Sequence, residues 1–261
     1  MKILFWSMFH GQPATTANLL AISCNIALNS EKKMLLMHNQ LQHSALEYYL
    51  NIRNTDRSTK GIDPVTAHLK NMSLKPDEIQ EYTTSILKDN RLDVLQGSKH
   101  SNQSLDQEFA KVFKASIDLA DKYYDYVFID AAAPENNNIV NLMETADLIF
   151  INVNQNRVVL SSTCEWYKKQ KKYEEKIHIL IGNYENECKF TLNNIKSKYG
   201  FKNVNKVNHD VVFKNHLGDS KTLEFLHKNK ATNRNDQVFP FMESIKEVSD
   251  FIIDKEAKRG S

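Results

Sequence analysis

The sequence predicts an α/β fold, in which a mostly parallel central sheet carries helices on both faces. Short runs of consecutive apolar residues recur along the chain, and segments with helical spacing lie between them. A strand that is apolar at every position is buried on both faces, which is typical of a parallel sheet covered by helices. The composition, 41% hydrophobic and 25% charged over 261 residues, is that of a globular protein with a large core.

Six apolar runs are predicted strands because each is short and bounded by polar or helical segments. In chain order they are residues 3–6, 34–37, 92–95, 126–129, 148–153 and 177–181. Four longer segments have helical periodicity, namely residues 16–29, 105–123, 158–173 and 241–253. The last of these has acidic residues on its polar face, whereas a helix that lies on a membrane surface has a basic one, so we expect it to pack on the sheet.

Residues 40–90 are too long for a simple connection between two strands. This stretch contains Tyr48, Tyr49 and Leu50, a polar segment over residues 53–60, and helical patterns on both sides of Pro76. We interpret it as a helical insertion at about residues 40–90 in a single domain that spans residues 1–261.

Charge and cysteine content bear on the class of protein. The formal net charge of +2 is too small to indicate nucleic-acid binding by itself. The lysine-rich residues 167–176 fit the solvated face of a helix, with nucleic-acid contact as the alternative that the net charge does not support. The three cysteines are widely spaced and form no metal-binding motif, so free thiols in a reducing compartment are expected. No apolar run approaches the about 18 residues of a membrane span, and we expect a cytoplasmic protein.

The segment that follows the first strand is a candidate phosphate-binding loop. It reads His10-Gly11-Gln12-Pro13-Ala14-Thr15-Thr16 and leads directly into a predicted helix. Backbone N–H groups and the positive end of a helix favour an anion at such a place. One of the two threonine hydroxyls fits a Mg²⁺ ligand, and the alternative is that both only cap the helix.

Two further polar residues follow predicted strands. Asp130 ends the fourth strand, where its carboxylate fits a ligand of Mg²⁺ or of a catalytic water, or merely a cap for the next loop. Asn183 follows the sixth strand, where it fits base recognition or simply turn formation. Because ligands bind beyond the carboxyl ends of strands in such sheets, we expect both residues to lie near the loop.

These segments together resemble the ParA/MinD family of deviant phosphate-loop ATPases. That family has K-G-G-x-G-K-[ST]-T after its first strand and an aspartate after a fourth strand similar to residues 125–130. Residues 92–98, 146–151 and 179–183 are similar to further strands of the family, in which the asparagine at the place of Asn183 faces adenine. The resemblance implies a phosphate-loop NTPase-like fold and ATP or ADP with Mg²⁺ as cofactor. It implies a nucleotide-binding set of Gly11, Gln12, Ala14, Thr15, Thr16, Asp130 and Asn183, with Thr15 and Asp130 at the metal.

The loop departs from the family at the positions that carry its chemistry. Phe9 and Ala14 stand where the family has its two lysines, and His10 and Pro13 stand where it has glycines. The second strand ends in His38 and Asn39, where the family has a carboxylate used in hydrolysis. Without the lysines, less positive charge is available to neutralise the phosphates, so weak or no ATP hydrolysis is expected.

Three functions remain open from the sequence. The first is a degenerate member that positions or assembles a cellular machine through a protein partner, in the style of TadZ-like proteins that serve pili. The second is an active ATPase in plasmid or chromosome partition, and the third is an enzyme of the related amidoligase or synthetase type. A homodimer is compatible with the resemblance, and the absence of the loop lysines predicts that it forms without nucleotide.

Overall fold

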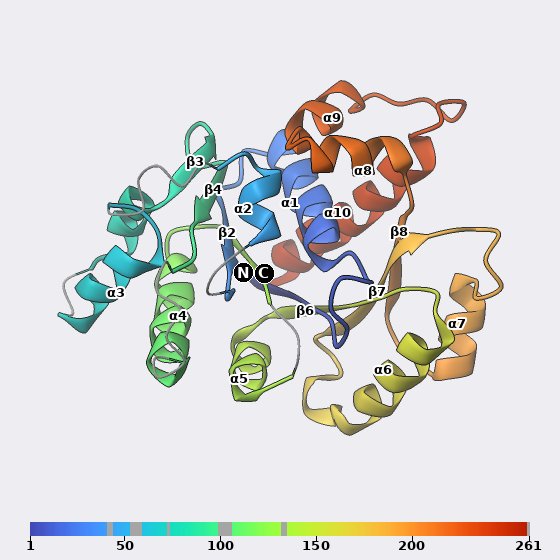
Figure 1. Ribbon diagram of the computed structural model, residues 1–261, viewed down its shortest axis with the longest axis horizontal. Coiled ribbons are helices and arrows are strands. Elements are labelled where there is room, and N and C mark those ends of the chain that lie inside the picture. The colour runs from blue at the N-terminus through green and yellow to red at the C-terminus, as the bar shows by residue number, and fades with distance from the viewer. Residues whose placement is uncertain (41–43, 53–58, 72–73, 99–105, 132–134, 260–261) are drawn as a thin grey trace.

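The central element is a twisted sheet whose strand order is β3-β4-β2-β5-β1-β6-β7-β8 (Figure 1). The computed structural model describes residues 1–40, 44–52, 59–71, 74–98, 106–131 and 135–259. Neighbouring strands run parallel, except that β3 is antiparallel to β4 at one edge. The strands are β1 (Lys2–Trp6), β2 (Met34–His38), β3 (Thr84–Leu87), β4 (Leu92–Leu95), β5 (Tyr126–Asp130), β6 (Leu148–Val153), β7 (Ile177–Tyr184) and β8 (Val204–Asn208).

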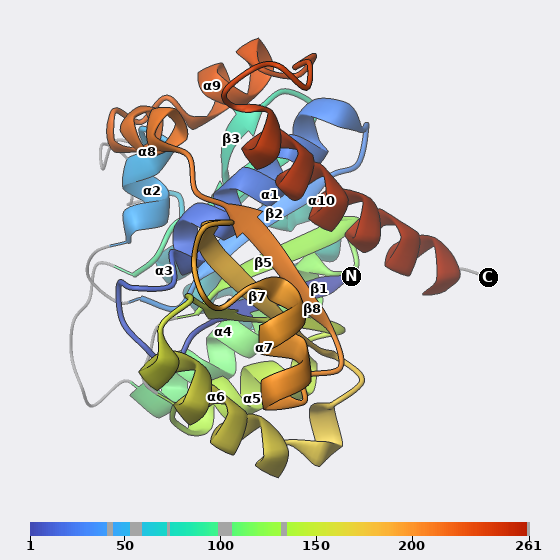
Figure 2. The same cartoon turned by 90° about the vertical axis from the view of Figure 1, so that its right-hand side faces the viewer.

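Helices cover both faces of the sheet (Figure 2). One face carries α1 (Thr15–Asn29), α2 (Ala45–Tyr49), α8 (Val211–Gly218), α9 (Thr222–Lys228) and α10 (Phe239–Arg259). The other carries α3 (Ile62–Lys70), η2 (Pro76–Tyr82), α4 (Asp106–Ala120), α5 (Asn137–Thr145), α6 (Arg157–Lys169), η4 (Lys171–Tyr173) and α7 (Leu192–Tyr199). The fold is therefore α/β with a mostly parallel sheet, as predicted.

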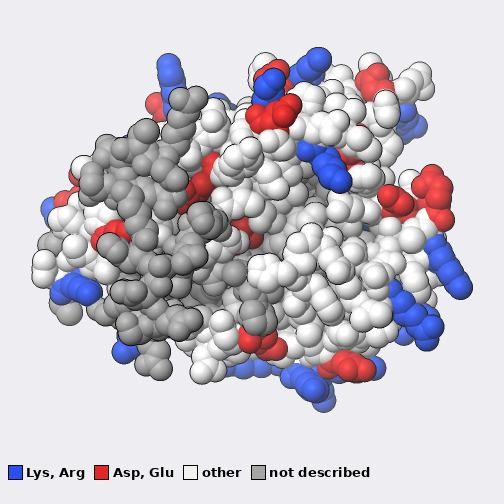
Figure 3. Space-filling model, in the orientation of Figure 1, with Lys and Arg blue, Asp and Glu red and all other residues white. Residues whose placement is uncertain are grey.

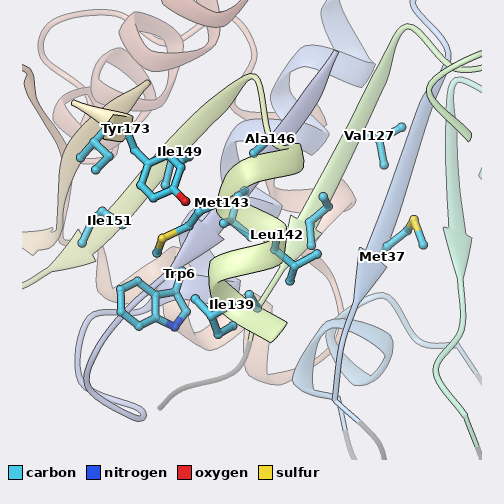
Figure 4. Packing of buried hydrophobic residues seen from close by; sticks show 14 of the residues in the cluster. Trp6, Met37, Val127, Ile139, Leu142, Met143, Ala146, Ile149, Ile151 and Tyr173 are labelled. Atoms are coloured by element: carbon cyan, nitrogen blue, oxygen red, sulfur yellow. The ribbon is translucent and has the colours of Figure 1, made fainter. Parts of the chain in front are cut away.

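Two hydrophobic cores form because successive side chains of a strand point to opposite faces. In β1, Leu4 and Trp6 belong to one core, and Ile3 and Phe5 belong to the other. All four are fully buried, which explains why this strand is apolar at every position. Figure 4 shows α5 packed over the sheet beside Trp6.

The six predicted strands correspond to β1, β2, β4, β5, β6 and β7, and β3 and β8 are additional strands that the sequence did not predict. Both are edge strands, and their residues are largely half-exposed, so they lack the continuous apolar run of a central strand. The region predicted as a helical insertion contains α2, α3, η2 and the unpredicted β3.

Predicted helix bounds differ from the observed ones at several ends. The segment 158–173 is not one helix, because α6 ends at Lys169 and a separate turn, η4, follows it. Residue 105, the predicted start of the segment 105–123, lies outside the described residues, and α4 spans Asp106–Ala120.

Candidate functional site

The loop between β1 and α1 lies at the carboxyl edge of the sheet, because it follows the end of β1. It lies near the middle of that edge, since β1 is paired with β5 on one side and β6 on the other. It ends in Ala14, whose φ of 56° and ψ of 36° are left-handed. This conformation is uncommon for a residue with a Cβ and costs about 1–2 kcal/mol. No side chain caps α1, so the N–H groups of its first turn face the loop without a side-chain acceptor.

Asp130 and Thr16 meet beside this loop. The Thr16 hydroxyl donates a hydrogen bond to Oδ2 of Asp130 over 2.7 Å. Asp130 is 1% exposed, and burial raises the pKa of its carboxyl, while the Thr16 hydrogen bond and the charge of His38 act in the opposite direction. The resemblance implies Thr15 and Asp130 at a metal, whereas in the structure the hydroxyl bonded to Asp130 is that of Thr16.

The end of β2 carries a buried histidine–carboxylate pair that the sequence analysis missed. His38 Nε2 lies 2.8 Å from Oε1 of Glu47, which comes from α2, and the same oxygen accepts a hydrogen bond from the Gly97 N–H. A Cβ at residue 97 would lie 2.4 Å from Cε1 of His38, so glycine is required for this approach. His38 is the register partner of Asp130, and the pair therefore borders the Thr16–Asp130 bond.

Buried amides fix the loop from the other side. The Asn18 side chain donates to the carbonyl of Pro13 over 3.2 Å and to Oδ1 of Asn152, on β6, over 2.8 Å. A Cβ at residue 182 would lie 2.4 Å from the Pro13 carbonyl oxygen, so Gly182 lets β7 approach the loop. No local signal marks Asn18 or Asn152, because one belongs to a helix and the other to an apolar strand.

A pocket of about 380 Å³ opens at the loop and gathers most of the predicted site. Gly11, Ala14, Thr15, Thr16, Asp130 and Asn183 all line it. Gln12 is exposed and is not among the described lining residues. Asn183 has a φ of 49°, a left-handed conformation that asparagine tolerates better than most residues, so a turn-forming role accounts for it as well.

The far wall of the pocket comes from β8 and α8, which the sequence did not predict, and from α10, which contains the predicted helix 241–253. β8, α8 and α10 contribute Val207, Asn208, Asp210, Phe213, Lys214, Leu217 and Phe241. Phe213 and Phe241 stack with their ring centroids 4.5 Å apart, and Asp210 caps α8 by accepting from the Phe213 N–H over 2.6 Å. The wall therefore combines an apolar surface with an amide and charged groups of both signs.

The oxygen atoms at the loop fit a Mg²⁺ ion that arrives with a nucleotide. Mg²⁺ prefers hard oxygen ligands and is commonly held by one or two carboxylates, with phosphates and waters as its other ligands. Asp130 and Thr16 provide one carboxylate and one hydroxyl, and the described residues contain no group of three or more His, Cys, Asp or Glu side chains arranged for a metal. These two residues would hold the ion, which would offset phosphate charge.

The described surface offers no broad basic area on the face drawn in Figure 3, where acidic and basic side chains are interspersed around the outline. Within the described residues, no helix is both long enough and apolar enough to cross a membrane.

Comparisons with solved structures give the fold. A ParA family ATPase from Chlorobium tepidum superposes with a TM-score of 0.75 at 16% identity, covering 95% of this chain and 98% of that one. MinD in the MinC:MinD complex of Aquifex aeolicus gives 0.73 at 12% identity, over 97% and 95% of the chains. MinD of Pyrococcus horikoshii complexed with Mg-ADP gives 0.68 at 14% identity, over 98% and 99%. No family model matches the chain, and neither does any curated protein.

Proposed function

We propose that this protein is a degenerate ParA/MinD-like nucleotide-binding protein that positions or assembles a cellular machine, with weak or no ATP hydrolysis. One observation carries the proposal: residues 7–16, which form the loop and the start of α1, contain no lysine or arginine. Phosphoryl transfer depends on cations placed around the phosphates, because negative charge develops there in the transition state. Relatives by fold are described as a ParA family ATPase and as MinD bound to Mg-ADP, which supports nucleotide as the ligand.

The chemistry of the surrounding carboxylates supports the same conclusion. Glu47 lies near the place of the family's hydrolytic carboxylate, but its Oε1 is bonded to His38 and to the Gly97 N–H and its side chain is buried. A carboxylate held in this way is poorly available to orient an attacking water. Asp130 is bonded to Thr16, which leaves it suited to a metal or to a structural role rather than to hydrolysis.

Exposed apolar side chains near the carboxyl edge of the sheet support the proposal that the protein acts through a protein partner. Tyr48, Val158 and Val211 are 65%, 66% and 56% exposed, and they lie on helices that follow β2, β6 and β8. Parallel strands end at one edge, so these residues share the side of the molecule that carries the pocket. One relative by fold is described in complex with MinC, which supports a protein partner.

Steady-state phosphate release from ATP with Mg²⁺ tests the proposal. The protein and its Thr16→Ala variant should both release phosphate at the background rate, because the loop lacks the cations that the reaction requires. Release that is well above background and is abolished in Thr16→Ala would replace the proposal with the alternative of an active ATPase in plasmid or chromosome partition.

A further inference from the structure

The charge around the pocket is unusual for a nucleotide site. Two carboxylates line it, those of Asp130 and Asp210. Among the described residues, Lys214 is the lysine that lines it, and no arginine does. Lys214 belongs to α8, on the wall opposite the loop. A ligand with a phosphate in this pocket therefore has one side-chain ammonium available, from an element unrelated to the loop.

Lys214 is not committed to another partner. Its side chain is exposed, and its ammonium makes no hydrogen bond or ion pair with the described residues. The Asp210 carboxylate, one helical turn earlier, is engaged as the cap of α8. A long side chain that lines a pocket without a carboxylate partner can turn toward an anion at the cost of only some rotamer entropy.

A second polar group in the same wall also lacks a partner. Asn208 is 6% exposed and lines the pocket, and its Oδ1 makes no hydrogen bond with the described residues. A buried amide oxygen without a partner costs free energy, which a ligand that donates a hydrogen bond would recover. Beside Asn208, Phe213 and Phe241 form an apolar part of the same wall, with their ring centroids 4.5 Å apart.

The structure assigns phosphate recognition to this wall, because the loop has no lysine or arginine that could provide it. Resting on the proposed function, we infer that Lys214 is the cation that binds a phosphate of a nucleotide in this pocket, with Asn208 as a hydrogen-bond acceptor for the same ligand. The uncapped N-terminus of α1 faces the pocket from the loop side and carries about half a positive charge. The phosphate would therefore lie between two positive groups, neither of which is a loop lysine.

Calorimetric titration of ADP, with and without Mg²⁺, tests the role of Lys214. Lys214→Ala should weaken ADP binding about tenfold, the effect of removing a hydrogen bond to a charged group. Lys214→Arg should retain most of the affinity. Lys221→Ala is the matched control. Lys221 is exposed, immediately precedes α9 and is not among the residues that line the pocket. Affinity should fall with added salt in the parent protein and less steeply in Lys214→Ala.

Thermal unfolding distinguishes a loss of ligand contact from a loss of structure. The melting temperature of Lys214→Ala should equal that of the parent, because the Lys214 side chain is exposed. Asn208→Ala should also weaken ADP binding but leave its salt dependence intact. Equal ADP affinity in the parent and Lys214→Ala would overturn the inference and leave the proposed function standing. An absence of ADP binding by the parent would overturn both the inference and the nucleotide binding of the proposed function. Phosphate release that Thr16→Ala abolishes would overturn the proposed function alone, whatever the role of Lys214.

Discussion

At the scale of single residues, Asp130 lies in a place that is unfavourable for a charge. It is almost fully buried, and its hydrogen bond from the Thr16 hydroxyl offsets only part of the lost hydration. A carboxylate kept at such a cost is more typical of a ligand site than of a purely structural position. The consequence is a measurable dependence of stability on pH.

Asp130→Asn should raise the melting temperature at pH 7 by a few degrees, about 2–4 °C for each kcal/mol recovered. The folded-state pKa of Asp130 is raised above the ordinary value of an aspartate by burial, so the native state binds the proton more tightly than the unfolded chain. Stability from this group is thus greatest below the unfolded pKa and is lost as pH rises through the folded pKa. The advantage of Asp130→Asn should accordingly vanish near pH 3.

Melting curves from pH 3 to pH 8 measure this difference. Asp254→Asn is the control, because Asp254 is exposed near the end of α10 and should show no such trend. A melting temperature that falls in Asp130→Asn at neutral pH would mean that the carboxylate stabilises the native loop.

Gly182 is a single residue that determines how closely β7 approaches the loop. Gly182→Ala should destabilise the protein by about 1–3 kcal/mol, since its Cβ would lie 2.4 Å from the Pro13 carbonyl and 2.6 Å from Nδ2 of Asn18. Gly218→Ala, where nothing lies within 4 Å of the added Cβ, should be neutral or slightly stabilising. Urea unfolding of both variants decides the matter, and equal stabilities would show that the loop moves away freely.

At the scale of elements, the short helix α2 is attached to the sheet by a polar contact as well as by packing. Glu47 reaches both the end of β2, through His38, and the residues after β4, through the Gly97 N–H. Leu46 of the same helix is fully buried in the core that it shares with α1. The pair thus holds α2 at the pocket, to which Ala45 and Tyr49 contribute.

Glu47→Ala should destabilise the protein by about 1–3 kcal/mol, the cost of leaving buried hydrogen-bonding groups without a partner. It leaves His38 and the Gly97 N–H without their acceptor. Glu81→Ala, at an exposed position of η2, should change stability by less than about 0.5 kcal/mol. Chemical denaturation measures both, and a small effect of Glu47→Ala would show that packing alone holds α2.

At the scale of the whole molecule, the missing loop lysines bear on association. Phe9, which the resemblance to the ParA/MinD family places at a lysine said to reach across a dimer in that family, is half-buried and packs against the core of its own chain. Its N–H donates to the Ser7 hydroxyl over 3.1 Å, so the residue belongs to the folded loop. An aromatic side chain held in this way cannot neutralise a phosphate of a second protomer.

We therefore expect the mass in solution to be independent of nucleotide. Light scattering of the pure protein should give one mass with and without ATP and Mg²⁺. Matched runs with ADP serve as the control for changes in buffer and ionic strength. A shift from monomer to dimer that requires ATP would contradict this prediction, because another cation would then have to act across the interface.

The central strands and the position of the loop are predictable from residue order alone. Consecutive apolar residues are a local signal, and they mark β1, β2, β5 and β6 because those strands are buried on both faces. The meeting of Asp130, Thr16 and Asn183 at one pocket was also predictable, since parallel strands end at the same edge.

The distant residues that complete the site are identified by tertiary contacts and not by local sequence patterns. The contact of Glu47 with His38, the Asn18–Asn152 hydrogen bond and the wall that carries Lys214 join separate elements. Their residues have no local pattern: β8 is a polar edge strand, and Asn152 lies within an apolar run. The physical reason is that such contacts depend on strand order and on how helices pack across the sheet, which residue spacing along one element does not encode.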